Sequence, residues 1–122
     1  MPMDFDTFHA YCLAKPGVEE TFPFDEVTLV FKVMGKMFAL SGLDREVFTM
    51  NLKCDPDWAL ELRERYEEVQ PGYHMSKKHW NTINGEGEMP EDLLYQLIDH
   101  SYDLVVASLP KKLRADLEEL DN

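Results

Sequence analysis

The chain is poor in cysteine, with two among its 122 residues and no Cys-x-x-Cys pair. Small disulfide-stabilised domains carry several cysteines at short spacings, so the chain does not fit that class. Cys12 and Cys54 lie far apart in the sequence, and an isolated free cysteine usually behaves as a small buried hydrophobic residue. We therefore predict that both thiols are reduced and buried.

Long apolar runs are also missing. No stretch approaches the ~18–20 apolar residues that a membrane-spanning helix requires. The first ten residues, MPMDFDTFHA, lack the basic segment followed by an apolar one that marks a signal peptide. These absences predict a cytoplasmic protein with no membrane partner. A length of 122 residues, 44% of them hydrophobic and 30% charged, predicts a single domain over 1–122 with one core.

The motifs of common enzymes and metal sites are absent as well. The chain has no Walker A loop, no Gly-x-Ser-x-Gly and no His-Glu-x-x-His. Its four histidines show no ligand spacing, and no carboxylate or thiol stands beside His74 or His79. We therefore predict a non-catalytic protein without a metal or another cofactor. An enclosed cleft lined by both histidines and a carboxylate would instead favour an enzyme or a ligand-binding domain.

Positive charge is scarce, because 12 lysines and arginines face 24 acidic residues and the net charge is −12. The charge is −5 over residues 1–27, zero over 28–84 and −7 over 85–122. Since lysine and arginine supply most of the affinity for a polyanion, a nucleic-acid site would have to use a local patch in the neutral middle. The acidic ends would instead attract a basic protein partner.

What the sequence does contain is a regular succession of helix and strand patterns. Helices are predicted at 4–15, from Asp55-Pro56 onward, from Pro90 onward and after Pro110. Strands are predicted at 27–33, 36–41, 47–53, 73–75 and 79–83. The order α-β-β-β-α-β-β-α-α predicts the α+β class, as a two-layer domain in which helices pack on an antiparallel sheet of about five strands.

The first three predicted strands form a meander with one apolar face and one wetter face. The apolar face is expected to carry Val27, Leu29, Phe31, Val33, Phe38, Leu40, Phe48, Met50 and Leu52. The wetter face is expected to carry Thr28, Val30, Lys32, Met37, Ala39, Ser41, Thr49, Asn51 and Lys53. A turn at Met34-Gly35 or one at Gly35-Lys36 would leave these faces unchanged, although the paired residues would differ.

The thirteen residues GYHMSKKHWNTIN, 72–84, gather basic and aromatic groups in an acidic chain, namely His74, Lys77, Lys78, His79 and Trp80. Two lysines at a turn tip could contact phosphates, and Tyr73 or an exposed Trp80 could stack on a base. Lys32, Lys36 and Lys53 could extend the same surface. Lysines at turns also protect sheet edges, and tryptophan is often a core residue. A binding surface and an ordinary polar hairpin therefore both remain open.

Two groups of motifs carry a resemblance to a known family. FPF at 22–24 is followed by KVMGKMFA at 32–39, and PGYHM at 71–75 is followed by KKHWNT at 77–82. With these motifs in this order, the sequence resembles the YjbR/MmcQ family of small bacterial proteins over essentially its whole length. The resemblance implies a two-layer α+β domain with an antiparallel sheet, grouped with frataxin-like or secretion-chaperone-like folds.

The resemblance also implies DNA binding, because the family is described as DNA-binding through two hairpins in a double-wing arrangement. In this chain the wings would turn near Met34–Lys36 and Ser76–Lys78. The predicted nucleic-acid-binding residues are Lys32, Lys36, His74, Lys77, Lys78 and His79. The partner would be double-stranded DNA. A protein-interaction or chaperone-like module, using the wetter sheet face or the acidic helices, is the alternative.

Overall fold

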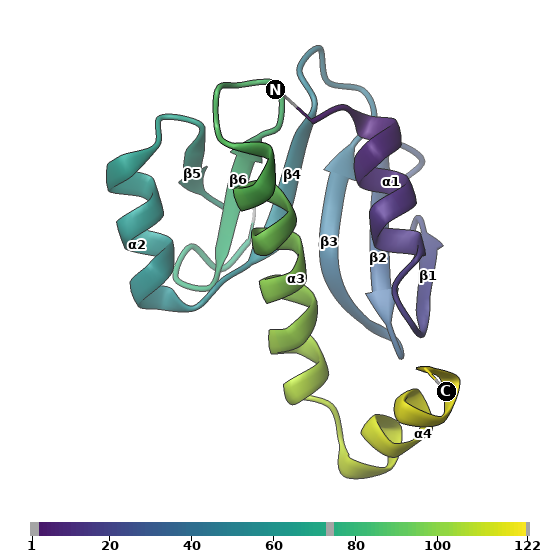
Figure 1. Cartoon of the computed structure of the whole chain (residues 1–122). Coiled ribbons are helices and arrows are strands. Elements are labelled where there is room, and N and C mark those ends of the chain that lie inside the picture. The colour runs from purple at the N-terminus through teal and green to yellow at the C-terminus, as the bar shows by residue number, and fades with distance from the viewer. Residues whose placement is uncertain (1–2, 73–74, 122) are drawn as a thin grey trace.

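A computed structural model describes residues 3–72 and 75–121 of the chain as one antiparallel sheet with helices against it (Figure 1). The helices are α1 (Phe5–Leu13), α2 (Pro56–Arg65), α3 (Glu91–Ala107) and α4 (Lys111–Asp121). The strands are β1 (Val18–Thr21), β2 (Thr28–Val33), β3 (Lys36–Gly42), β4 (Thr49–Lys53), β5 (Val69–Pro71) and β6 (Trp80–Asn84). In space the strands follow the order β1-β2-β3-β4-β6-β5. The predicted α+β class with an antiparallel sheet is confirmed.

The first two helices begin where their capping residues predict. The Asp4 carboxylate accepts a hydrogen bond from the backbone N–H of Thr7 at 2.8 Å, and the Asp55 carboxylate accepts one from that of Trp58 at 3.2 Å. Both bonds satisfy N–H groups that the first turn of a helix leaves unpaired. Within the ranges 3–72 and 75–121, no helix is both long enough and apolar enough to span a membrane.

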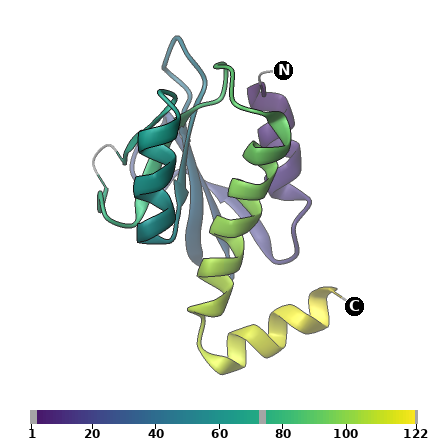
Figure 2. The same ribbon diagram turned by 60° about the vertical axis from the view of Figure 1, so that its left-hand side comes forward.

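Helices α1, α2 and α3 cover one face of the sheet, and the main core lies between them and the strands (Figure 2). Both cysteines belong to this core, as predicted, and burial raises the pKa of each thiol to about 12. Ser101 ties α3 to the sheet, because its hydroxyl donates to the carbonyl of Phe38 at 2.5 Å and accepts from the N–H of Lys53 at 2.9 Å. The helices are thus attached to one face of the sheet by the main core and by the hydrogen bonds of Ser101.

The last helix, α4, lies beyond the end of α3, beneath the turn that joins β2 and β3 (Figure 1). Leu117 is its buried residue, and it packs against Gly17. A Cβ at Gly17 would lie 2.6 Å from the Cδ1 atom of Leu117, and Gly17 has a φ of 72°. A glycine is therefore required here for the helix to approach and for the backbone conformation.

The sheet has six strands, so the prediction of five and of the order α-β-β-β-α-β-β-α-α is wrong. The additional strand is β1, which precedes β2 and pairs with it from Val18 opposite Val33 to Thr21 opposite Val30. In the second hairpin, Val69–Pro71, which was not predicted as a strand, pairs with β6. Residues 73 and 74 of the predicted strand lie outside the described residues.

A β-bulge in the β2–β3 hairpin changes the predicted faces. Lys32 lies opposite Met37, whereas Phe31 lies opposite Ala39, so one additional residue of β3 is inserted between these pairs. Phe38 and Ala39 consequently both join the main core. Leu40 then falls on the other face, and the same shift removes Ala39 and Ser41 from that face. The predicted places of these three residues are therefore wrong.

Candidate functional site

Among the residues that the structure describes, no helix lies on the second face of the sheet, and we call this face the open face. Since directly paired residues of neighbouring strands share a face, the register assigns its central residues. They are Thr28, Val30 and Lys32 of β2, Met37, Leu40 and Gly42 of β3, Thr49, Asn51 and Lys53 of β4, and Trp80, Thr82 and Asn84 of β6. The open face therefore combines threonines, asparagines and lysines with a small apolar group.

That apolar group is a second, smaller core made by Val30, Leu40 and Trp80, with Met37 and Met75 packed against it. Met75, which precedes β6, therefore lies over the open face. Trp80 is only 7% exposed. The tryptophan is thus a core residue, and the idea that it offers a stacking surface for a base is wrong.

Four lysines lie at one end of the open face, where β2 and β4 finish and β3 and β6 begin. Lys32 is the last residue but one of β2, Lys53 is the last residue of β4, and Lys77 and Lys78 are exposed just before β6. We call Lys32, Lys53, Lys77 and Lys78 the lysine end. Among the residues that the structure describes, none of the ion pairs involves any of the four.

The other predicted site residues have different surroundings. Lys36 starts β3 at the same end of the sheet, but its amine donates to the carbonyl of Ser108 at 3.4 Å, beyond the last turn of α3. This position suits a cation at the negative end of a helix dipole. The side chain of His79 is exposed beside the lysine end. His74 lies outside the described residues.

Hydrogen bonds from Arg63 of α2 hold the turn that carries Lys77 and Lys78. The Arg63 guanidinium donates to the side-chain oxygen of Asn81 at 2.7 Å, to the carbonyl of Trp80 at 3.3 Å and to the carbonyl of Lys77. The carbonyl of His79 accepts from the N–H of Cys54 at 2.8 Å. These bonds hold the lysine-bearing turn against the sheet, although no motif in the sequence signals the role of Arg63.

The opposite end of the open face is acidic. Asp25 and Glu26 precede β2, Asp44 and Glu46 lie between β3 and β4, and all four side chains are exposed. We call these four residues the acidic rim. The Asp25 carboxylate accepts from the N–H groups of Val27 and Thr28 at 3.0 and 2.7 Å, and these bonds lower its pKa. The open face therefore carries its lysines at one end, where Glu19 of β1 lies opposite Lys32. At the other end the four acidic residues surround one cation, Arg45, so the excess charge there is negative.

A groove of about 600 Å³ runs between these two ends. Its floor is formed by Thr28, Leu40, Thr49, Asn51 and Thr82, all on strands of the open face. Met37 and Met75 line it toward the lysine end, and Phe24, Asp25 and Asp44 line it toward the acidic rim. No pattern in the sequence indicates this groove, since its residues come from five separate segments and share no spacing.

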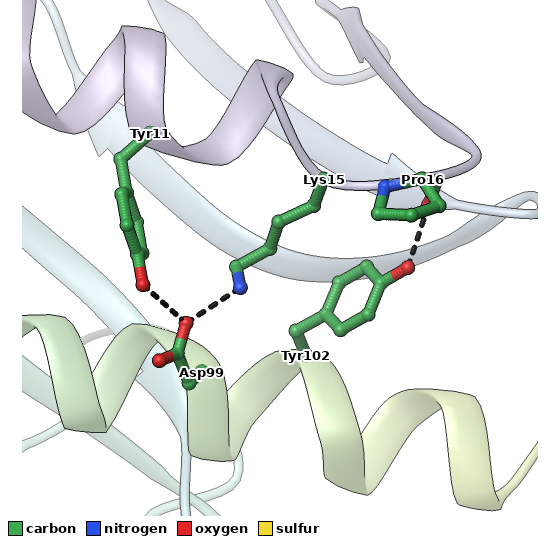
Figure 3. Close-up of polar contacts among 5 residues, drawn as sticks. All are labelled: Tyr11, Lys15, Pro16, Asp99 and Tyr102. Carbon is green, nitrogen blue, oxygen red and sulfur yellow. Dashed lines mark hydrogen bonds and ion pairs between the residues drawn. The ribbon is translucent and has the colours of Figure 1, made fainter. Parts of the chain in front are cut away.

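On the face of the sheet that the helices cover, polar contacts of Tyr11, Lys15, Asp99 and Tyr102 join α1 to α3 (Figure 3). The carboxylate of Asp99 accepts from the Tyr11 hydroxyl at 2.7 Å and from the Lys15 amine at 2.5 Å. The same amine lies 4.9 Å from the ring centroids of Tyr11 and Tyr102, and the Tyr102 hydroxyl donates to the carbonyl of Pro16 at 2.6 Å. Burial, followed by the bond to Asp99, raises the pKa of Tyr11 to about 12. The contacts fasten α1 to α3.

No metal site is formed by the part of the chain that the structure describes, because it holds no group of three or more His, Cys, Asp or Glu side chains that could share an ion. The described lining of the groove also contains no histidine. The predicted alternative of a cleft lined by histidines and a carboxylate therefore gains no support from these residues.

Comparison with known proteins gives matches over most of the chain. Residues 13–104 match the model of the YjbR family. The uncharacterised protein YbdF of Escherichia coli O157:H7 is 42% identical over 107 residues, which are 88% of each chain. The uncharacterised protein YjbR of Escherichia coli strain K12 is 34% identical over 110 residues, which are 90% of this chain and 93% of that protein.

A solved structure resembles the fold closely. It is the crystal structure of the Deinococcus radiodurans protein DR2400, a domain of the DUF419 model. The two chains superpose with a TM-score of 0.87 and are 39% identical, over 93% of this chain and 86% of the other. The likeness therefore extends to the arrangement of helices and strands that forms the open face.

Proposed function

We propose that this chain, which belongs to the YjbR family, binds DNA without catalysis through the lysine end of its open face. The observation that carries the proposal is the gathering of Lys32, Lys53, Lys77 and Lys78 at one end of a helix-free surface. Ammonium groups without ion-pair partners are free to replace the counterions of phosphates, which is the main source of affinity for DNA. His79 adds a hydrogen-bonding group at the same end.

The size of the lysine end limits the strength of binding. About four phosphate contacts give a logarithmic salt slope of about −3 to −4, which corresponds to a loss of roughly a hundredfold in affinity between 50 and 200 mM salt. The net charge of −12 opposes additional phosphate contacts. We therefore expect micromolar or weaker binding near physiological salt.

The experiment compares two double charge reversals by fluorescence anisotropy with a labelled oligonucleotide. Lys77→Glu with Lys78→Glu removes half of the lysine end, whereas Lys111→Glu with Lys112→Glu makes the same change of net charge on exposed residues of α4. We expect the first variant to lose at least tenfold in affinity and about half of the salt slope. The second should retain most of both, and equal losses in the two variants would show that net charge alone acts.

A protein-interaction role is the second candidate, and one observation favours it. Large apolar side chains are exposed in the two loops that carry the acidic rim, at Phe22, Phe24, Val27, Leu43 and Val47. Exposed apolar groups beside acidic ones suit a basic protein partner. Capture of a defined basic protein by the purified chain, together with no oligonucleotide binding at 50 mM salt, would favour this role over DNA binding.

A further inference from the structure

We infer that the groove of the open face receives an unpaired base of a single-stranded nucleic acid whose phosphates lie on the lysine end. The inference rests on the proposed function and goes beyond it, because it names the form of nucleic acid and a second set of contacts. A groove of about 600 Å³ is within the usual range of 300–1,000 Å³ for small-molecule sites. It can therefore hold flat rings as well as side chains.

The floor of the groove offers hydrogen bonds to the edge of a base. The Thr82 hydroxyl donates to the side-chain oxygen of Asn51 at 2.5 Å, which fixes the orientation of that amide. The Asn51 amide nitrogen has no hydrogen-bond partner within residues 3–72 and 75–121, and Asn51 is half-buried in the floor. An oriented amide in a half-buried position can donate to the acceptor atoms that every base carries.

The walls of the groove offer stacking and adaptable apolar contacts. Phe24 lines the groove and is 64% exposed, so covering its ring with a base removes apolar surface from water. Met37 and Met75 line the end near the lysines, and methionine side chains adjust to rings of different shape. Sheets that bind single strands elsewhere use the same combination of aromatic stacking and backbone-tracking cations.

The lysines neighbour these contacts in the sheet. Lys32 is paired with Met37 across β2 and β3. Lys53 lies two residues beyond Asn51 on the same face, and Lys77 follows Met75 by two residues. We therefore place over the groove the base of a nucleotide whose phosphate contacts the lysine end.

The acidic rim disfavours a duplex in the same position. A duplex has two rows of phosphates separated by grooves about 6 and 12 Å wide. A strand of six residues, such as β2, spans about 20 Å, so a second row would be brought toward Asp25, Asp44 and their neighbours. A single strand has only one row, and it can turn that row to the lysines while its bases face the groove.

The test measures anisotropy with a labelled twelve-nucleotide strand, first alone and then annealed to its complement, at 50 mM salt. The matched variants are Phe24→Ala and Phe22→Ala, since Phe22 is 46% exposed in the same loop but does not line the groove. We expect the single strand to bind at least tenfold more tightly than the duplex. Phe24→Ala should lose about tenfold for the single strand only, and Phe22→Ala should bind like the parent.

Four outcomes would overturn the inference. Equal affinity for strand and duplex would show that the groove does not bind an unpaired base, and so would equal effects of Phe24→Ala and Phe22→Ala. DNA binding at the lysine end would still be tested separately by the reversal of Lys77 and Lys78. A free mononucleotide that competes as effectively as the twelve-nucleotide strand would make the groove a site for small nucleotides. Binding of neither oligonucleotide would refute the proposed function together with the inference.

Discussion

Arg63 on α2 donates a hydrogen bond from its Nε atom to the buried side-chain oxygen of Asn81 on β6, at 2.7 Å. Asn81 is 1% exposed, and its amide nitrogen finds no partner among the described residues. The whole hydrogen bonding of this side chain within residues 3–72 and 75–121 thus depends on one guanidinium group, which also holds the carbonyls of Lys77 and Trp80. The shape of the lysine end depends on the same group.

We predict that Arg63→Leu lowers the free energy of unfolding by about 1–3 kcal/mol, because a buried oxygen loses its donor. Urea denaturation measures the change, and hydrogen exchange at the N–H groups of His79 and Trp80 should become faster. Arg65→Leu is the control, since Arg65 is an exposed arginine of the same helix. Equal stability of the two variants would contradict a positioning role for Arg63.

Asp99 joins α3 to α1 through a partly buried lysine. The side chain of Lys15 is 17% exposed, and Asp99 is its ion-pair partner at 2.5 Å. We predict that Asp99→Asn costs about 1–2 kcal/mol of stability, since the lysine charge stays partly buried without a counter-charge; the 44% exposure of Asp99 keeps the value small.

The control for this change is Asp103→Asn, an exposed aspartate one turn further along α3. Both variants alter the net charge equally, and Asp99 is the one of the two that contacts α1 among the described residues. Urea denaturation curves of the two proteins should separate clearly. Curves that coincide would mean that the Tyr11–Lys15–Asp99 group contributes nothing measurable to the attachment of α1.

His100 makes stability depend on pH on the acid side. Its Nε2 atom accepts from the N–H of Asp55 at 3.0 Å, and its ring meets that of Trp58 edge to face at 4.6 Å between centroids. Burial lowers the pKa of His100 below 6.5, although the carboxylates of Asp55 and Asp103 act in the opposite direction. The unfolded chain therefore binds this proton more readily than the folded one, and stability is lost as the pH falls below 6.5.

Replacement of this histidine should remove that part of the pH dependence. We expect His100→Phe to lose less stability than the parent between about pH 7 and about pH 5, as measured by urea denaturation at both values. His79→Gln is the control because His79 is exposed, and its pH dependence should match that of the parent. A parent-like slope in His100→Phe would show that protonation of His100 is not coupled to folding.

The sequence predicts those parts of the fold that depend on local patterns. The helix that starts at Asp55-Pro56 is found because the cap and the first turn are adjacent in the chain. Strand β1 is missed because its sequence, Val-Glu-Glu-Thr, has no apolar alternation, and it exists only through pairing with β2. The bulge at Phe38 is missed for a similar reason. The sequence of β3 still alternates between apolar and other residues, so the inserted residue is evident only from the pairing with β2.

The candidate site shows the same division. The lysines of the neutral middle of the chain are found by composition, Lys77 and Lys78 stand out by their place in a predicted turn, and the resemblance selects these two together with Lys32 and Lys36. The contact of Lys36 with Ser108 joins residues 72 positions apart, and no local pattern signals it. The groove is equally hidden, because Phe24, Asn51 and Met75 come together only when the meander, the loop after β1 and the loop before β6 are assembled.

The separation of the lysine end from the acidic rim also affects how the molecule meets a charged partner at a distance. Unlike charges at two ends of one surface form a dipole, and the field of an approaching polyanion exerts a torque on it. If DNA is the partner, as proposed, this torque favours an approach of the open face with its lysines first, while the chain as a whole, at −12, is repelled. On that proposal, the two ends of the open face select the orientation of the encounter before any contact has formed.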